Sequence, residues 1–166
     1  LFSNEGKAIR FAETDVRSMG RSAKGVRGMR VTIGAVQTEE ADDVDSDDED
    51  LDTTFISRIV SLVVVPETGE VLCASANGYG KRTVLADFRH SGRGTQGVRA
   101  IADSERNGIV VGAKLVNDDD EIMLITTGGV LIRTRVSEIR GMGRATQGVT
   151  LISLDDGEKL AGLEKV

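Results

Sequence analysis

The 166-residue sequence has no tryptophan, one proline (Pro66) and one cysteine (Cys73), and aromatic residues make up only 3% of it. A lone cysteine excludes a disulfide framework and a cysteine-ligated metal site, and it fits a reducing cytoplasm. The scarcity of aromatic side chains argues against a surface that stacks on single-stranded bases. No apolar run is long enough to span a membrane and no signal-peptide pattern is present, so we expect a soluble protein without a membrane partner.

What the sequence does have is 20 glycine residues, alongside a hydrophobic content of 39%. This combination predicts a packed core and many tight turns between short strands, because glycine marks turns and helical periodicity is weak. The chain opens on Leu1 without an initiator methionine. We therefore expect it to be a piece of a longer protein.

The net charge of −6 hides two opposite regions. Residues 39–52 (EEADDVDSDDEDLD) hold ten acidic side chains and no basic one, and the rest of the chain carries 21 basic against 17 acidic side chains. Such a run cannot bury itself against its own repulsion, so we expect a disordered surface loop. It is either a solubilising linker or a polyanion mimic that competes for a basic surface. It lacks the turn glycine and the spaced terminal glutamate of an EF-hand calcium loop.

One pattern recurs three times: an acid, an apolar residue, arginine, two free positions, Gly-Arg, three free positions and Gly-Val. The copies are residues 15–26, 87–98 and 138–149. The register extends upstream, because Gly6, Gly78 and Gly129 align, as do Arg10, Arg82 and Arg133. Copies one and two lie 72 residues apart (Arg21 to Arg93), and copies two and three lie 51 apart (Arg93 to Arg144). The acidic run accounts for the excess, so the repeat unit is about 51 residues, as in propeller blades.

The segments between the copies are typical of strands. We expect strands within 56–65, 69–78, 109–129, 130–136 and 158–166, about four per unit. In 130–136 the alternation places Arg133 and Arg135 side by side on an accessible face. We therefore predict an all-β, propeller-like fold of three repeats, about 1–56, 57–108 and 109–166, forming a partial arc with an exposed sheet edge at one end.

The motifs GYGKRT (78–83), VRSMGRSAKGVRGM (16–29) and GMGRATQGVTLI (141–152) resemble the C-terminal domain of DNA gyrase A. The resemblance covers nearly the whole chain apart from the acidic run, and it includes the repeat register. It implies a β-pinwheel, whose blades exchange a strand, and the three copies resemble its last three blades. The Gln-Arg-Arg-Gly-Gly-Lys-Gly box of the first blade is absent, which fits a C-terminal half.

The resemblance further implies that duplex DNA is bound and wrapped around a basic outer rim, in support of ATP-dependent negative supercoiling by a type IIA topoisomerase. The implied partners are the remainder of gyrase A and the gyrase B protein in an A2B2 holoenzyme, with ATP and Mg²⁺ on other domains. The implied location is the bacterial cytoplasm, at the nucleoid. No catalytic residue, cofactor or metal is expected in this chain. The similar C-terminal DNA-binding domain of topoisomerase IV is an alternative.

Arginine suits phosphate because its planar fork donates two hydrogen bonds, and glycine lets backbone N–H groups approach phosphate oxygens. The second arginine of each copy lies between the loop glycines, and we favour it as a phosphate contact. The first arginine is either a DNA contact or the partner of the nearby acid. The strand arginines are solvated rim charges or DNA contacts. The candidate DNA-binding residues are Arg21, Arg93, Arg144, Arg17, Arg89, Arg140, Arg10, Arg82, Arg133, Arg135, Lys24 and Lys81.

Catalysis finds no support in the sequence. Tyr79 occupies a variable turn position, aligned with Lys7 and Val130, and His90 has no partner for a catalytic triad. The GYGK and GMGRATQG stretches lack the spacing of a phosphate loop and of a dinucleotide fingerprint. A protein-binding propeller is the second functional class that stays open, with regulator-of-chromosome-condensation repeats as its best representative. Arginines buried between blades would favour that scaffold, and a continuous outer basic band would favour DNA.

Overall fold

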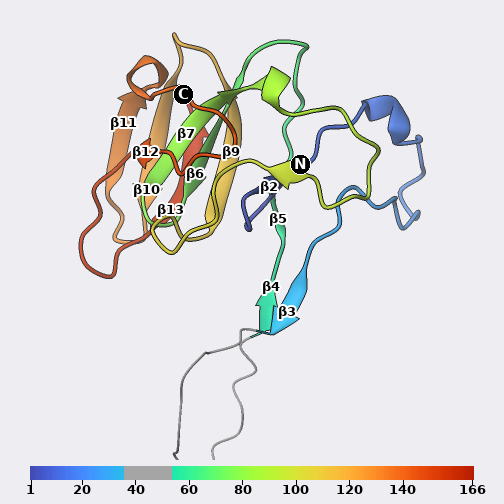
Figure 1. Ribbon diagram of the computed structural model, residues 1–166, viewed down its shortest axis with the longest axis horizontal. Helices are drawn as coiled ribbons and strands as arrows, with labels where there is room; N and C mark the ends of the chain where they lie inside the picture. The colour runs from blue at the N-terminus through green and yellow to red at the C-terminus, as the bar shows by residue number, and fades with distance from the viewer. Residues whose placement is uncertain (36–53) are drawn as a thin grey trace, which may run out of the picture.

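The computed structural model describes residues 1–35 and 54–166, which form short β-strands and three single 3-10 turns (Figure 1). Three antiparallel sheets make up the body. The first contains β1 (Phe2–Ser3), β2 (Lys7–Ala8), β5 (Ile59–Ser61) and β8 (Val98–Arg99). The second contains β6 (Glu70–Ser75), β7 (Tyr79–Val84), β9 (Val110–Val116) and β12 (Val149–Thr150). The third contains β10 (Glu121–Thr126), β11 (Leu131–Arg135) and β13 (Leu160–Lys165).

The three sheets repeat one arrangement. Their strand orders are β5-β1-β2-β8, β9-β6-β7-β12 and β13-β10-β11, so equivalent strands occupy equivalent places. The hairpin in each turns at a glycine with positive φ, namely Gly6 (73°), Gly78 (82°) and Gly129 (84°). Each of these glycines donates its backbone N–H to the carbonyl three residues earlier. The all-β, propeller-like fold expected from the sequence register is therefore confirmed.

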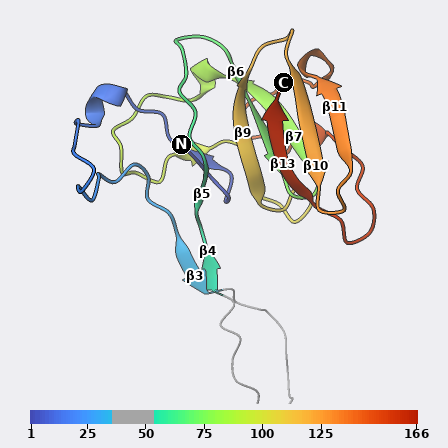
Figure 2. The ribbon, with the colours of Figure 1, turned by 180° about the vertical axis from the view of Figure 1, so that it is seen from behind.

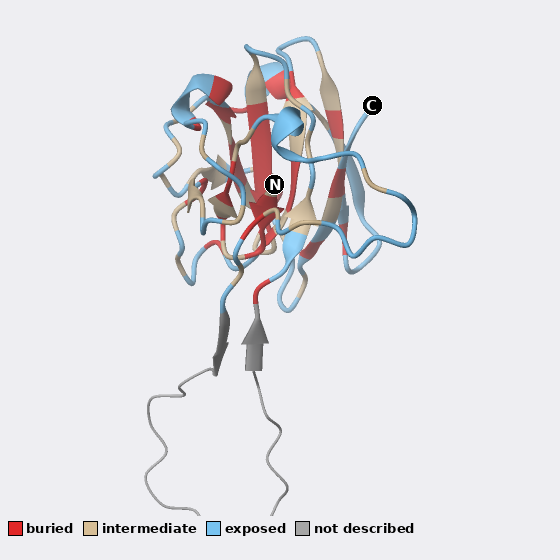
Figure 3. Ribbon diagram, turned by 90° about the vertical axis from the view of Figure 1, so that its right-hand side faces the viewer, coloured by how far each residue is buried: buried red, intermediate tan, exposed pale blue. Residues whose placement is uncertain are grey.

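The core lies between neighbouring sheets, because the central strands are apolar on both faces. In β6, residues 71–75 are all buried, with Val71 and Cys73 packed toward the first sheet and Leu72 and Ala74 toward the third. Figure 3 shows this as buried strands surrounded by exposed loops. Burial on both faces explains why this segment reads in the sequence as an apolar run rather than an alternation.

Neighbouring sheets also exchange a strand. The segment after the second Gly-Arg stretch supplies β8 to the first sheet, where Lys7 pairs with Arg99 and Ala8 with Val98. The segment after the third supplies β12 to the second sheet, where Val149 pairs with Gly80 and Thr150 with Tyr79. The first and second sheets are thus each completed by a later part of the chain, and this exchange places the second and third Gly-Arg stretches between adjacent sheets.

Strand lengths differ from the expectation in one place. The apolar segment 56–65 forms no continuous strand: Ile56 ends β4, only Ile59–Ser61 form β5, and Leu62 and Val64 beyond it are 71% and 78% exposed. The reason is that its partner β1 has two residues, Phe2 and Ser3, so no ladder extends along Leu62–Val65. A chain segment with high β propensity stays irregular where no neighbour supplies hydrogen bonds.

Residues 33–35 and 54–56 form a separate two-stranded stem, β3 (Ile33–Ala35) and β4 (Thr54–Ile56), that projects from the body (Figure 1). Ile33 pairs with Ile56 and Ala35 with Thr54. The stem flanks the acidic run. The predicted disorder of residues 39–52 lies outside the described residues.

The third sheet ends in an open edge. β11 pairs with β10 alone, and no described strand occupies the place that β12 takes beside β7, as the view from behind shows (Figure 2). Val130 and Leu131 at this edge are 48% and 54% exposed. An unpaired, apolar edge is a template for pairing with another chain.

We expect the chain to self-associate through the β11 edge as its concentration is raised. Leu131→Lys should suppress that association, because an edge lysine opposes strand pairing. Sedimentation velocity across a concentration series measures it. Val64→Lys is the matched control, since Val64 is also exposed and apolar but lies outside any strand. A wild-type sedimentation coefficient independent of concentration would contradict this expectation.

Candidate nucleic-acid interface

The three Gly-Arg stretches form loops of one design, called here loop one (15–26), loop two (87–98) and loop three (138–149). Each follows a 3-10 turn: Glu13–Asp15, Leu85–Asp87 and Val136–Glu138. Each closes on a glycine with positive φ, at Gly25 (78°), Gly97 (74°) and Gly148 (88°). The repeat in the sequence is therefore a repeat of backbone conformation.

Neighbouring Gly-Arg loops are joined in a row, which we call the Gly-Arg edge. Loop two joins the segment after loop one, because Gly94 donates its N–H to the Gly28 carbonyl at 2.6 Å and Arg30 donates to the Thr95 carbonyl at 2.9 Å. Loop three joins the segment after loop two in the same way, with Ala102 donating to the Thr146 carbonyl at 3.0 Å. Arg30 and Ala102 are equivalent in the repeat register, so the junction is repeated.

The second arginines fasten each loop to the one before it. The Arg93 guanidinium donates from Nη1 to the Arg27 carbonyl at 3.1 Å and from Nε to the Asp15 carbonyl at 3.0 Å. Arg144 donates from Nη1 to the Arg99 carbonyl at 3.3 Å, and Arg99 is the repeat equivalent of Arg27. Arg21 is exposed and bonds to no described residue. Arg93 and Arg144 thus hold the edge together and still present unused N–H groups to solvent.

The first arginines are the least engaged cations of the loops. Arg17, Arg89 and Arg140 are exposed, and none forms a hydrogen bond or ion pair with residues 1–35 or 54–166. The same holds for Lys24 in loop one. Loop structure therefore does not require these four side chains, and their charge is available to a ligand.

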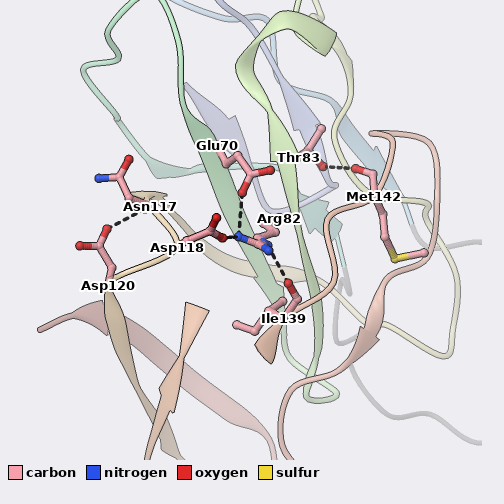
Figure 4. Close-up of polar contacts among 8 residues, drawn as sticks. All are labelled: Glu70, Arg82, Thr83, Asn117, Asp118, Asp120, Ile139 and Met142. Carbon is pink, nitrogen blue, oxygen red and sulfur yellow. Dashed lines mark hydrogen bonds and ion pairs between the residues drawn. The ribbon is translucent and has the colours of Figure 1, made fainter. Parts of the chain in front are cut away.

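The strand arginines are held by the protein to different degrees. Figure 4 shows Arg82 enclosed: Nε donates to the Ile139 carbonyl at 2.6 Å, and Nη1 contacts Glu70 at 3.0 Å and also Asp118. Its side chain is 15% exposed, and the hydrogen bond with Asp118 is the main cause that raises its pKa. Arg10 donates to the Leu85 carbonyl at 2.9 Å. These two are fixed between sheets and are poorly placed for a phosphate.

Arg133 and Arg135 lie on the same face of β11, as the alternation predicts, with side chains 58% and 71% exposed. Both approach Glu121, the repeat equivalent of Glu70, and Arg133 forms an ion pair with it. One carboxylate therefore offsets part of the charge of this pair.

Lys81 is not on the surface. Its side chain is fully buried, and Nζ donates to the Gly143 carbonyl at 2.7 Å and to Thr146 Oγ1 at 3.2 Å. The sequence placed it in the basic GYGKRT stretch and so indicated a rim cation. The reason for the difference is that loop three folds over β7 and covers it.

Two features of the edge are missed by reasoning from the sequence. Arg106 stacks over the Tyr79 ring at 4.1 Å and donates to Gln147 at 3.0 Å, which ties a non-repeated segment to loop three. The carbonyls of Arg27 and Arg99 accept the bonds of the second arginines. The Gly-Val-Arg sequence at 25–27, repeated at 97–99, is the one sequence signal that marks these two accepting carbonyl groups.

The described residues contain no group of three or more His, Cys, Asp or Glu side chains placed to hold a metal ion. Nor does this part of the chain include a helix of the length and apolarity that crossing a membrane requires.

Comparison with known proteins gives a consistent result. Residues 1–44, 69–117 and 120–166 match the family described as DNA gyrase C-terminal domain, beta-propeller. The DNA gyrase A protein of Haemophilus influenzae is 48% identical, over all of this chain and 20% of that protein. The gyrase A protein of Escherichia coli is 45% identical, over all of this chain and 16% of that protein. The chain thus spans about a fifth or less of the length of these relatives.

Among solved structures, a DNA gyrase A C-terminal domain superposes with a TM-score of 0.79 at 27% identity, covering 99% of this chain and 48% of that one. The C-terminal domain of a DNA topoisomerase IV superposes with a TM-score of 0.76 at 20% identity, which shows a shared fold. Each of the three matched segments contains one Gly-Arg loop, and together they place this chain in the DNA gyrase C-terminal domain family.

Proposed function

We propose that this chain binds duplex DNA along its edge of Gly-Arg loops and bends the duplex around it. The observation that carries the proposal is the continuity of that edge: three loops of one conformation, joined by equivalent hydrogen bonds, each present an exposed first arginine. A regular row of cations on a rigid scaffold matches the regular charge of a DNA backbone. Such contacts position a duplex without reading its bases.

We further propose the setting of this function. The chain acts as the C-terminal half of a β-pinwheel, in three repeats at about 1–56, 57–108 and 109–166, within a bacterial gyrase. It is a non-catalytic part of that ATP-hydrolysing topoisomerase, in a cytoplasmic, nucleoid-associated A2B2 complex with the gyrase B protein. The identity of the gyrase A relatives supports this setting over topoisomerase IV, whose structural match is at 20% identity. ATP and Mg²⁺ would be used by other domains.

A salt-dependent binding titration tests the proposal. Affinity for a duplex should fall steeply and linearly with the logarithm of salt concentration, since each neutralised phosphate releases counterions. Unrelated duplex sequences should give the same slope. Failure to bind duplex DNA at low salt, or binding that ignores salt, would remove DNA from the proposed function.

A protein-binding scaffold is the second candidate. It is favoured by Arg82, which is enclosed between sheets, and by Arg93 and Arg144, which spend part of their hydrogen bonding on neighbouring loops. The same titration separates the two, because a scaffold without a phosphate-binding edge has no reason to bind duplex DNA with a steep salt slope.

The acidic run supplies a further prediction. Replacing residues 39–52 with a Gly-Ser segment of equal length should tighten duplex binding at low salt if the run competes for the basic edge. The gain should shrink as salt rises, because exposed charges are screened. A variant with the same composition in scrambled order is the control and should bind as the wild type does. Unchanged affinity of the Gly-Ser variant across the salt series would identify the run as a plain linker.

A further inference from the structure

Lys81 lies where the other two repeats have isoleucine. The register that aligns Gly6, Gly78 and Gly129 places Lys81 level with Ile9 and Ile132. Its side chain has no exposure to solvent, and burying an ammonium group is costly unless it is well paired. A lysine at a position that isoleucine fills elsewhere therefore needs an explanation beyond packing.

Both partners of the ammonium group belong to the turn that carries Arg144. Nζ donates to the Gly143 carbonyl at 2.7 Å and to Thr146 Oγ1 at 3.2 Å, one on either side of that arginine. Thr146 Oγ1 in turn donates to the Gly143 carbonyl at 2.9 Å. The ammonium group thus closes a small network beneath the turn.

Loop two shows what the lysine adds. Both loops are held along the neighbouring strand by a backbone bond: Ser91 donates to the Arg10 carbonyl at 2.9 Å, and Met142 donates to the Arg82 carbonyl at 2.8 Å. Figure 4 shows the second contact of loop three, from Thr83 Oγ1 to the Met142 carbonyl at 2.9 Å. Beneath loop two the level position is Ile9, which cannot donate a hydrogen bond. Loop three alone of this pair has a charged anchor.

The charge of the anchor changes in an accessible pH range. Burial is the main cause that lowers the pKa of Lys81 to about 8, and the nearby Arg144 acts in the same direction. Asp87 in the 3-10 turn before loop two acts in the opposite direction, and so would a thiolate at Cys73 on β6. Burial raises the pKa of the Cys73 thiol to about 12, so the thiol stays neutral around pH 8.

We propose that Lys81 is the positioning residue of loop three: its buried ammonium group fixes the turn that presents Arg144, and its proton makes the DNA contact of this loop depend on pH. The inference rests on the proposed DNA-binding function. Phosphates that approach Arg144 favour the charged form of Lys81 beneath it, so duplex binding takes up part of a proton near pH 8. Above that pH the contact weakens, because charge-assisted bonds to the turn are lost.

The first measurement is duplex affinity from pH 6.5 to 9.5 at constant ionic strength. Wild-type affinity should fall as pH rises through about 8, by up to roughly eightfold at 0.1 M salt, the value of one phosphate contact. Lys81→Met and Lys81→Ile should bind at the weaker level without this step. Lys159→Met removes an equal charge from an exposed side chain and should retain the step. A wild-type step that persists in both Lys81 variants would overturn the proposal.

A second measurement needs no DNA. The backbone amide signals of Gly143, Ala145 and Thr146 in NMR should titrate with a midpoint near pH 8 in the wild type, and those of loop two should not. Flat loop-three signals would refute the anchoring role even if duplex binding is found. Signals that titrate in a chain that binds no duplex would support the anchor and reject the DNA-binding function.

The pH dependence of the free energy of unfolding provides a third test of the Lys81 assignment. The folded chain binds the Lys81 proton less tightly than the unfolded chain, whose lysine pKa is near 10.5. The free energy of unfolding should therefore rise with pH between about 8 and 10.5 in the wild type and stay flatter in Lys81→Met. An equally steep rise in the variant would contradict the assignment of this proton to Lys81.

Discussion

Replacing Gly148 with alanine is expected to lower the free energy of unfolding by about 2–5 kcal/mol, the sum of a backbone term and a packing term. Gly148 has a φ of 88°, which side chains rarely adopt, and a Cβ there would lie 2.5 Å from the Gly80 carbonyl oxygen. Gly80 belongs to β7 and pairs with Val149 of β12, the residue that follows Gly148. The added methyl group therefore forces apart the exchanged strand and its host sheet. For a chain of this size the melting temperature should fall by roughly 10 °C.

Gly25→Ala is the matched control for this experiment. Gly25 has a φ of 78°, close to that of Gly148, but a Cβ there meets nothing within 4 Å. It should cost only the backbone term, about 1–2 kcal/mol. Chemical denaturation of the two variants isolates the packing term as the difference between them. Equal losses would mean that the β12 exchange contributes nothing specific to stability.

The contrast between Gly25 and Gly148 also shows which part of the structure the sequence predicts and which part it does not. The repeat register predicts that Gly25, Gly97 and Gly148 share a conformation, and all three have positive φ. Only the three-dimensional arrangement separates them, since Gly97 packs against Ala8 and Gly148 against Gly80, while Gly25 faces open space. A residue's own backbone geometry is encoded locally, whereas its neighbours come from a strand that the sequence places far away.

The same distinction accounts for Lys81 and Arg82. The local sequence pattern predicts that Lys81 and Arg82 lie in a basic stretch beside a turn. Their burial, however, depends on contacts with loop three and with Asp118, which are distant in the sequence. One of these contacts could be predicted from the sequence. Glu70 aligns with Glu121 in the register, and Arg82 aligns with Arg133. The ion pairs Glu70–Arg82 and Glu121–Arg133 both form in the structure. Acid and base that recur together at one spacing indicate a structural ion pair. Asp118 aligns with Glu67 in the register, but Glu67 forms no ion pair with Arg10 among the described residues, so the repeat pattern does not predict the contact between Asp118 and Arg82.

Removing the first arginines together should have the largest effect on DNA binding. The triple variant Arg17→Ala, Arg89→Ala, Arg140→Ala should lower the salt-dependence slope by about 3 units and the affinity at 0.1 M salt by two to three orders of magnitude, roughly the value of three phosphate contacts. The loss should be the same for unrelated duplexes, because phosphate contacts carry no base information. Folding should survive, since these side chains are exposed and bond to no described residue.

The second arginines should respond differently, and the difference is measurable. Arg21→Ala, Arg93→Ala, Arg144→Ala should lower the slope by a similar amount, but Arg93 and Arg144 also hold neighbouring loops. Their loss should therefore lower the denaturation midpoint as well, which the first set should leave unchanged. In an intact gyrase, either triple variant should reduce wrapping and negative supercoiling and leave DNA cleavage in place.

A charge-matched control separates a local edge from general attraction. Three lysines lie away from the loops. Lys114 lies on β9 and Lys165 on β13, and Lys159 immediately precedes β13. In the second and third sheets, β9 and β13 are the edge strands on the side opposite β7 and β11. Replacing these three with alanine changes the net charge by the same amount as either arginine triple. If the loops form the DNA-binding edge, this variant keeps the wild-type salt slope, because contacts and not net charge set the number of counterions released. A loss of slope equal to that of the arginine variants would show that duplex DNA does not distinguish the Gly-Arg edge from the rest of the surface.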